Sequence, residues 1–264
     1  MYDFQYHRPK SVADAVAALK KAADGKLIAG GQTLLPTLKM RLAQPTDLVD
    51  LSGVPELRGI KVEGNAVVIG AMAKHAEVSA SAEVQKAIPA LAMLASEIGD
   101  AQVRNMGTLG GSIANSDPAA DYPAAIVGLN ATIKTNERTI AADDFFKGIF
   151  TTALKEGEVI ISVSFPVPEK AAYMKFDNPA SRFAMVGVFV AKLAGGVRVA
   201  VTGAGPSVFR VKAMEEALAK DFSGKAVENI KVPTTGLNSD IHGSAEYRAH
   251  LVTVMAKRAA DAAK

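Results

Sequence analysis

The stretch TLGGSIANSDPAADYPAA, residues 108–125, decides how this 264-residue chain is interpreted. It begins with a small-residue turn around Gly110 and Gly111, and it ends in Asp-Tyr-Pro at residues 121–123, which is typical of a helix start. A second glycine-rich stretch, KLIAGGQTLLP, occupies residues 26–36. Both stretches carry small polar groups and almost no reactive side chains, which favours binding over catalysis.

The earlier stretch is predicted to be a strand that enters a turn at Gly30-Gly31 and continues into a helix. Glycine permits positive φ angles and lets a ligand approach the backbone closely. Consecutive N–H groups in such a turn, followed by a helix start, suit an anion such as a diphosphate. A tight turn that binds nothing is the stronger interpretation of one Gly-Gly pair, and the spacing matches neither G-x-G-x-x-G nor a P-loop.

The later stretch repeats the pattern, with small polar groups and exposed backbone expected at Thr108, Gly110, Gly111 and Ser112. Asp121 is either the N-cap of the following helix or an acceptor for ligand hydroxyl groups. Two such turns in one chain suggest one long ligand held at two places, and a dinucleotide has that shape. From these residues alone, ligand binding and purely structural turns are equally supported.

The composition excludes several classes of protein. Basic and acidic residues, 30 and 27, are interspersed without a Lys/Arg block, which argues against nucleic-acid binding. The chain has no cysteine, so disulfides, thiolate-bound zinc or iron–sulfur clusters and a catalytic thiol are excluded. We find no apolar run of membrane-spanning length and no signal peptide, and we expect a cytoplasmic protein without a membrane span.

Hydrophobic periodicity divides the chain into three segments. In the first, residues 26–30 are predicted to be a short buried strand and residues 45–54 an edge-like strand. In the second, residues 81–99 are predicted to be a helix that Pro89 kinks or splits, and a hairpin is expected to turn near Asn136.

The third segment is predicted to be two strands joined at Gly195-Gly196, followed by a C-terminal amphipathic helix. The apolar residues of this helix recur at helical spacing and predict its buried face: Tyr247, Leu251, Val254 and Met255. We expect Arg248 on this helix to be mostly solvated, and likewise Glu158 in an earlier turn.

The remaining motifs indicate no other chemistry. The four histidines are scattered without metal-ligand spacing, and Ser112 lacks the G-x-S-x-G elbow of hydrolases. Gly203-Ala204-Gly205 is followed by Pro206 and lacks the third glycine of a dinucleotide fingerprint. The residues by themselves support a dinucleotide or flavin binder without acid–base machinery.

Taken together, AGGQTLLP and QVRNMGTLGGSIANSDPAADYPAA resemble the two FAD-binding signatures of the flavin subunit of molybdenum hydroxylases. This family includes the medium subunit of aerobic carbon monoxide dehydrogenase and the FAD subunit of xanthine dehydrogenases. The resemblance spans nearly the whole chain, from YDFQYHRPKSVADAVAAL near the start to SAEYRAHL near the end. It implies an α+β protein with a vanillyl-alcohol-oxidase-type (PCMH-like) FAD-binding fold in two subdomains, residues 1–56 and 57–169. A C-terminal α/β domain with an antiparallel sheet would follow at residues 170–264.

Carried over by position, the resemblance implies FAD contacts at both glycine-rich stretches and at three later positions, with no catalytic residue and no metal ligand. Backbone N–H groups of the first stretch would wrap the diphosphate of FAD: Leu27, Ile28, Ala29, Gly30, Gly31, Gln32, Thr33 and Leu34. A second clamp would consist of Thr108, Gly110, Gly111 and Ser112. Asp121 would bind hydroxyl groups of FAD, Ile160 would lie against the flavin, and Lys175 would reach it from the third segment.

The resemblance also implies partners and a function. Substrate oxidation would occur at a molybdenum cofactor on a large subunit, and [2Fe-2S] clusters on a small subunit would pass electrons to FAD on this chain. FAD would deliver them to an external acceptor, within a dimer of heterotrimers. The absence of cysteine agrees, because the clusters must then lie on another chain. The alternatives are a stand-alone FAD-dependent oxidase or dehydrogenase of the same fold and a non-catalytic module that has lost flavin. The sequence leaves the substrate open among carbon monoxide, aldehydes, purines and other N-heterocycles.

Overall fold

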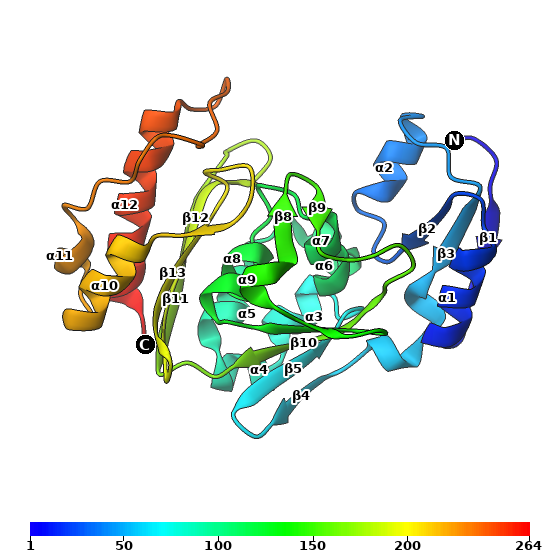
Figure 1. Ribbon diagram of the computed structural model, residues 1–264, viewed down its shortest axis with the longest axis horizontal. Coiled ribbons are helices and arrows are strands. Elements are labelled where there is room, and N and C mark those ends of the chain that lie inside the picture. The colour runs from blue at the N-terminus through cyan, green and yellow to red at the C-terminus, as the bar shows by residue number, and fades with distance from the viewer.

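The computed structural model describes residues 1–264 and places three parts one after another along the long axis of the molecule (Figure 1). The N-terminal part forms one end, the middle part forms the centre, and the C-terminal part forms the other end. The protein combines helices with parallel and antiparallel sheets, as predicted. It contains no helix that is both long enough and apolar enough to cross a membrane.

The N-terminal part is a small parallel sheet with helix α1 packed on it. Its elements are β1 (Gln5–His7), α1 (Val12–Lys21), β2 (Gly25–Ile28), α2 (Leu34–Lys39), β3 (Asp47–Asp50), and the 3-10 helices η1 (Leu51–Gly53) and η2 (Pro55–Leu57). The hydroxyl group of Ser11 caps α1 by accepting a hydrogen bond from the backbone N–H of Asp14.

The strand order β1-β3-β2 corrects the sequence-based prediction for this sheet. β3, expected at an edge, is the central strand and buries Leu48 and Val49 because it pairs in parallel with both neighbours. Asp47 at its start is bonded by the imidazole of His7, with 2.6 Å between Nε2 and Oδ1. β2, expected to be buried, is an edge strand of mostly half-buried residues that leads directly into the first glycine turn.

The middle part is a five-stranded antiparallel sheet of order β4-β5-β10-β6-β7, covered by helices. Its strands are β4 (Ile60–Glu63), β5 (Ala66–Gly70), β6 (Thr132–Thr135), β7 (Thr139–Ala141) and β10 (Ile160–Pro166), with a small hairpin of β8 (Phe146–Gly148) and β9 (Thr151–Thr152). Its helices are α3 (His75–Ala80), α4 (Ala82–Ala87), α5 (Pro89–Ser96), α6 (Ala101–Met106), α7 (Leu109–Asn115), α8 (Tyr122–Gly128) and α9 (Ala142–Phe145). The predicted split at Pro89 and the hairpin near Asn136 are both confirmed.

The C-terminal part is a four-stranded antiparallel sheet between two layers of helices. It consists of β11 (Lys170–Asp177), β12 (Ala184–Leu193), β13 (Gly196–Thr202), β14 (Phe209–Arg210), α10 (Lys212–Lys220), α11 (Gly224–Val227) and α12 (Ala245–Ala262). Alternate residues of β12 face opposite ways: Val188 joins the core beneath α12, whereas Phe189 joins the core of the middle part. The hairpin predicted at Gly195-Gly196 is confirmed.

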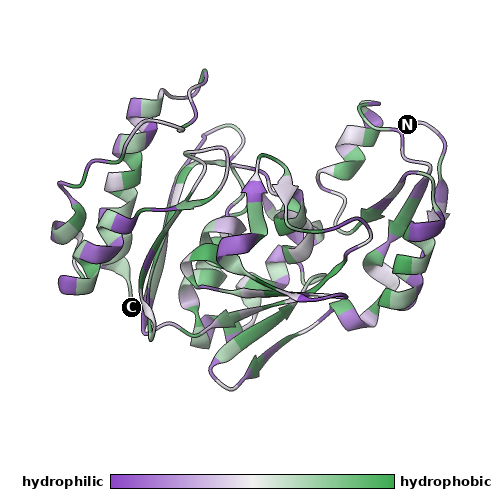
Figure 2. Ribbon diagram, in the orientation of Figure 1, coloured by the Kyte–Doolittle hydropathy of each residue, from purple (hydrophilic) through white to green (hydrophobic).

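Three hydrophobic cores hold the parts together, and Figure 2 shows the strands of the larger sheets mainly in the colour of apolar residues. The largest core lies in the middle part and the second lies between the C-terminal sheet and α12. The third belongs to the N-terminal part, yet it includes Met72 and Val159 from the middle part. The boundaries at residues 56 and 169 stay predictions.

Two charged residues that were expected in solvent are buried. Arg248 packs its side chain under the C-terminal sheet, donates to the backbone oxygens of Met185 and Gly203, and forms a double hydrogen bond with Asp240. Glu158 is bonded by Arg138 and lies 5% exposed. The predictions that Arg248 and Glu158 are solvated were wrong. Helical spacing and position in a turn do not predict ion pairs with residues far away in the sequence. On α12, Leu251 and Met255 are buried as predicted, whereas Tyr247 is 42% exposed.

Candidate functional site

The first glycine segment, residues 29–34, connects the end of β2 to α2. The backbone N–H groups of residues 29–33 donate no hydrogen bond to any group of the chain. Gly31 has φ +71°, a conformation that side-chain-bearing residues rarely adopt. Unpaired amides of this kind need water or an anion as acceptor. The segment therefore fits the predicted cradle for a diphosphate.

The second glycine segment, residues 107–112, begins helix α7 and is not an open turn. Its amides, apart from that of Thr108, already donate within the chain; for example, Gly110 N donates to Ala71 O at 2.8 Å and Gly111 N to Thr108 Oγ1 at 3.1 Å. Gly110 is buried. The expectation of exposed backbone is wrong there, because these amides donate to Ala71 and Ala73, just after β5, and within α6 and the start of α7.

The two glycine segments, far apart in sequence, are packed against each other. A side chain on Gly30 would collide with the carbonyl oxygen of Met106 and with Gly107. A side chain on Gly111 would lie 2.9 Å from Thr108 Oγ1 and 3.5 Å from the Cβ of Ala29. The structure thus brings the two predicted clamps together, and glycine is required where the backbones meet.

His75 supports the second glycine segment from behind. Its backbone N–H donates to Gly107 O at 3.0 Å, and its ring lies against Gly107 and at 5.4 Å from the ring of Tyr122. Burial, with a smaller contribution from Arg104, lowers the pKa of His75 to about 4, so the imidazole is neutral at pH 7. Nδ1 of His75 has no hydrogen-bond partner. His75 is the first residue of α3, and no sequence motif marks it for this role.

Asp121 and Lys175 form a buried ion pair, each side chain 5% exposed, with 2.9 Å between Oδ1 and Nζ. The same oxygen accepts a hydrogen bond from Tyr173 at 2.7 Å, and Lys175 Nζ also donates to the carbonyl of Glu97 at 3.1 Å. Burial raises the pKa of Asp121, and Lys175 and Tyr173 oppose this shift. Asp121 precedes α8, but its side chain makes no capping bond, so the cap-only interpretation is wrong.

Ile160 and the apolar members of the first stretch serve mainly as framework. Ile160 begins β10, is 5% exposed, and belongs to the largest core. Leu27 and Ile28 lie in β2 and pair with Val49 and Asp50 of β3. No hydrogen bond or ion pair joins the Asp121–Lys175 pair to residues 27–34.

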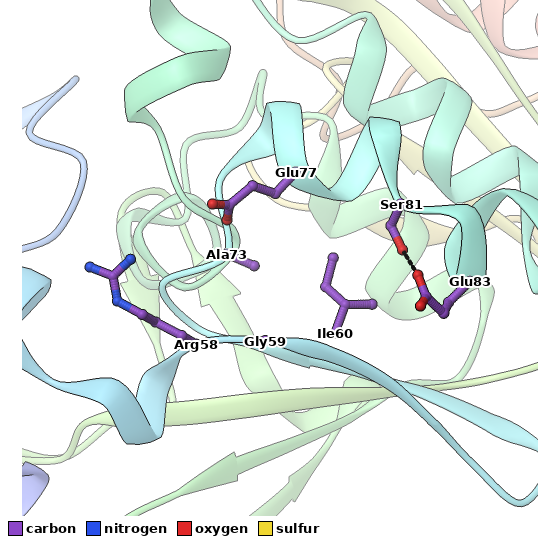
Figure 3. Close-up of a pocket in the computed structure, with 7 residues that line it drawn as sticks. All are labelled: Arg58, Gly59, Ile60, Ala73, Glu77, Ser81 and Glu83. Atoms are coloured by element: carbon purple, nitrogen blue, oxygen red, sulfur yellow. Dashed lines mark hydrogen bonds between the residues drawn. The ribbon is translucent and has the colours of Figure 1, made fainter.

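A cavity of about 310 Å³ lies on another side of the middle part, between β4 and helices α3 and α4 (Figure 3). Its lining consists of Arg58, Gly59, Ile60, Ala73, Glu77, Ser81 and Glu83. The polar groups there are already used: Glu77 accepts from Lys74 N, Ser81 donates to Glu83, and Arg58 donates to Ser52 O. The hydrogen bonds of Glu77, Ser81 and Arg58 are thus local to this cavity, and none of them joins it to either glycine segment.

Comparison with known proteins identifies the family. Residues 2–168 match the family described as the FAD binding domain in molybdopterin dehydrogenase. This chain belongs to that family. The medium chain of carbon monoxide dehydrogenase from Hydrogenophaga pseudoflava is 38% identical, over 98% of this chain and 96% of the relative. The medium chain of glyceraldehyde dehydrogenase from Sulfolobus acidocaldarius is 34% identical, over 97% of both chains.

The structural comparison agrees. A solved carbon monoxide dehydrogenase from Hydrogenophaga pseudoflava, which lacks the Mo-pyranopterin moiety of its molybdenum cofactor, contains a chain that superposes with a TM-score of 0.88. The two chains are 39% identical, and the match covers 98% of this chain and 96% of the other. The predicted family, the fold class and FAD as cofactor are confirmed. The chain is an FAD-binding oxidoreductase subunit of the molybdenum hydroxylase type.

Proposed function

We propose that this chain carries FAD and passes electrons from iron–sulfur clusters of a partner subunit to an external acceptor. The observation that carries this proposal is the run of unpaired amides at residues 29–33, centred on Gly31 with its positive φ. A diphosphate supplies the acceptors that these amides lack. When bound, FAD supplies the redox chemistry, and the residues of this chain bind and orient it.

The proposed binding site has a cradle and a remote anchor. Residues 27–34 would hold the diphosphate. Thr108, Gly110, Gly111 and Ser112 would lie beside them, because Gly30 packs against Met106 and Gly107 and Gly111 lies close to the Cβ of Ala29. Asp121 and Lys175 would meet FAD at the remote anchor, where Tyr173 fixes the orientation of the carboxylate. Ile160, which belongs to the largest hydrophobic core, would lie against the flavin and support it.

We infer the partners from the family. Because the chain has no cysteine, the [2Fe-2S] clusters of the assembly would lie on a separate small subunit, and a large subunit would hold the molybdenum cofactor. The two relatives described above are medium chains of enzymes named for carbon monoxide and for glyceraldehyde, although the chains are alike. We infer that the large subunit selects the substrate and that the assembly is a dimer of heterotrimers in the cytoplasm.

The cradle is tested by Gly31→Val, with Gly195→Val as the matched control. Valine is strained at φ +71°, whereas the side chain added at Gly195 meets no atom within 4 Å. We expect the Gly31 variant to lose its FAD, measured as released flavin per chain, and the Gly195 variant to keep it. Full flavin in both variants, with unchanged circular dichroism, contradicts the cradle.

The assembly is tested by native mass spectrometry of the tagged chain isolated from its own host. We expect one complex that contains FAD, a molybdenum cofactor and an iron–sulfur subunit. A lone chain that holds FAD and oxidises a substrate identifies a stand-alone flavoenzyme. A lone chain without flavin contradicts both the proposed subunit role and the stand-alone flavoenzyme.

A further inference from the structure

A polar cavity of about 350 Å³ lies where the middle and C-terminal parts meet. No hydrophobic residue lines it; its lining consists of Ser96, Glu97, Gly99, Arg104, Lys175, Asp177 and Arg182. Lys175 joins this cavity to the remote anchor, because its ammonium group contacts both Asp121 and the carbonyl of Glu97. The cavity is therefore connected, through one side chain, to a residue that the proposed function places at the FAD.

Glu97 is the unusual member of this lining. It ends helix α5, and its Oε2 atom is fully buried without any hydrogen-bond partner. A buried carboxylate oxygen without a partner is costly while it is charged, and protonation removes most of that cost. The carboxyl group of Glu97 can therefore be charged or neutral. The cavity gives a proton a route between this group and solvent.

The charges that face Glu97 are of both signs. Lys175 and, across the cavity, Arg104 and Arg182 are cationic, whereas Asp121 and Asp177 are anionic. The Nη1 atom of Arg104 donates hydrogen bonds to the carbonyl oxygens of Ile98 and Gly99. Burial raises the pKa of Glu97; Lys175 opposes this shift, and the two aspartates reinforce it. A further negative charge nearby would raise the pKa again.

We propose that Glu97 binds a proton when the FAD of this subunit is reduced and releases it when the FAD is reoxidised. This inference rests on the proposed function. FAD that has received two electrons from the iron–sulfur clusters and one proton would carry one additional negative charge. The Glu97 carboxylate would then bind a second proton, which solvent supplies through the cavity. On reoxidation, the acceptor receives the two electrons and both protons return to solvent.

The test is an equilibrium redox titration of the purified complex over a series of pH values. Each proton taken up with two electrons shifts the flavin potential by about 30 mV per pH unit, the value of a tenfold change for a two-electron couple. We expect the slope to correspond to two protons in the native complex and to one in Glu97→Gln. Glu97→Asp should restore the second proton. The control Asp177→Asn, an exposed carboxylate of the same cavity, should keep the native slope.

The possible outcomes separate the inference from the proposed function. A native slope in Glu97→Gln with full flavin overturns the role of Glu97 and leaves the proposed function intact. A native complex without FAD overturns both. If Glu97→Gln loses its flavin, the reduced-minus-oxidised infrared spectrum of the native complex decides. A new protonated-carboxyl band that shifts in Glu97→Asp supports the inference, and its absence overturns it.

Discussion

In the first glycine segment the amides of residues 29–33 donate to nothing in the chain, whereas in the second glycine segment all amides except that of Thr108 are already bonded. The same residue type therefore serves two purposes. At Gly31, glycine permits a backbone conformation that presents N–H groups outward. At Gly110, glycine permits helix α7 to touch the backbone of Ala71. The comparison predicts that substitutions in the first segment change FAD binding, and that substitutions around the second change stability.

The largest loss of stability is expected for Asp121→Asn, in the same stretch of sequence, residues 108–125, as the second glycine segment. The change leaves the buried ammonium group of Lys175 without its counter-charge. Breaking one side of a buried pair costs about 3–5 kcal/mol in the free energy of unfolding. Urea denaturation measures this loss. Asp144→Asn, on the exposed part of α9, is the control, and equal stability of the two variants contradicts the prediction.

Lowering the pH should destabilise the fold around the second glycine segment, because His75 becomes protonated. The imidazole has its ordinary pKa of 6.5 in the unfolded chain and a pKa of about 4 in the folded one, so the unfolded state binds more protons between these values. The stabilisation is complete above pH 6.5 and is lost as the pH falls through 4. Its size is about 3 kcal/mol. His75→Gln should flatten this part of the stability curve, and an unchanged curve would show that His75 does not titrate there.

Gly110→Ala should destabilise the chain by about 2 kcal/mol, because the added methyl group overpacks a closed contact. The new Cβ would lie 2.6 Å from the Cβ of Ala71 and 2.8 Å from its carbonyl oxygen. The control Gly195→Ala adds a methyl group where nothing lies within 4 Å. Thermal unfolding of both variants without FAD measures the difference. Equal melting temperatures would remove the distinction between the two glycine segments.

The smallest predicted change in the free energy of unfolding concerns two threonines, each of which directly precedes a helix. Thr108→Val removes the oxygen that caps α7 and should cost about 1 kcal/mol. Thr33 precedes α2 in the same way, but its side chain makes no capping bond. Thr33→Val should therefore change the free energy of unfolding by less than about 0.5 kcal/mol. Similar losses in urea denaturation would mean that the first segment is also held by its side-chain cap.

Local sequence patterns predicted the elements well where neighbours along the chain determine them. Ser11 with Asp14 begins a helix, Pro89 divides one, and Gly195-Gly196 turns a hairpin. The strand order of the N-terminal sheet was not predictable in this way, because it depends on which strands pair across long distances. The buried positions of Arg248 and Glu158 depend on partners far away in sequence for the same reason.

The candidate site divides along the same line. Two glycine pairs identified both segments, but the sequence does not show that Gly30 packs against the backbone of Met106 and Gly107 and so brings the segments together. Likewise, resemblance to the family pointed to Asp121 and Lys175, while their direct pairing is visible only in the structure. Glu97 gave no signal, because its unpartnered oxygen arises from the meeting of two parts of the molecule.

The core of the N-terminal part contains Met72 and Val159, and this has a consequence for synthesis on the ribosome. At about 5–20 residues per second, Val159 is made roughly 5–20 seconds after Val49, so the first core lacks this residue for that time. Strand β10, which begins at Ile160, must also emerge before the central sheet can close between β5 and β6. The cradle at residues 29–33 therefore acquires its final support late, and FAD loading follows translation of the whole flavin-binding region.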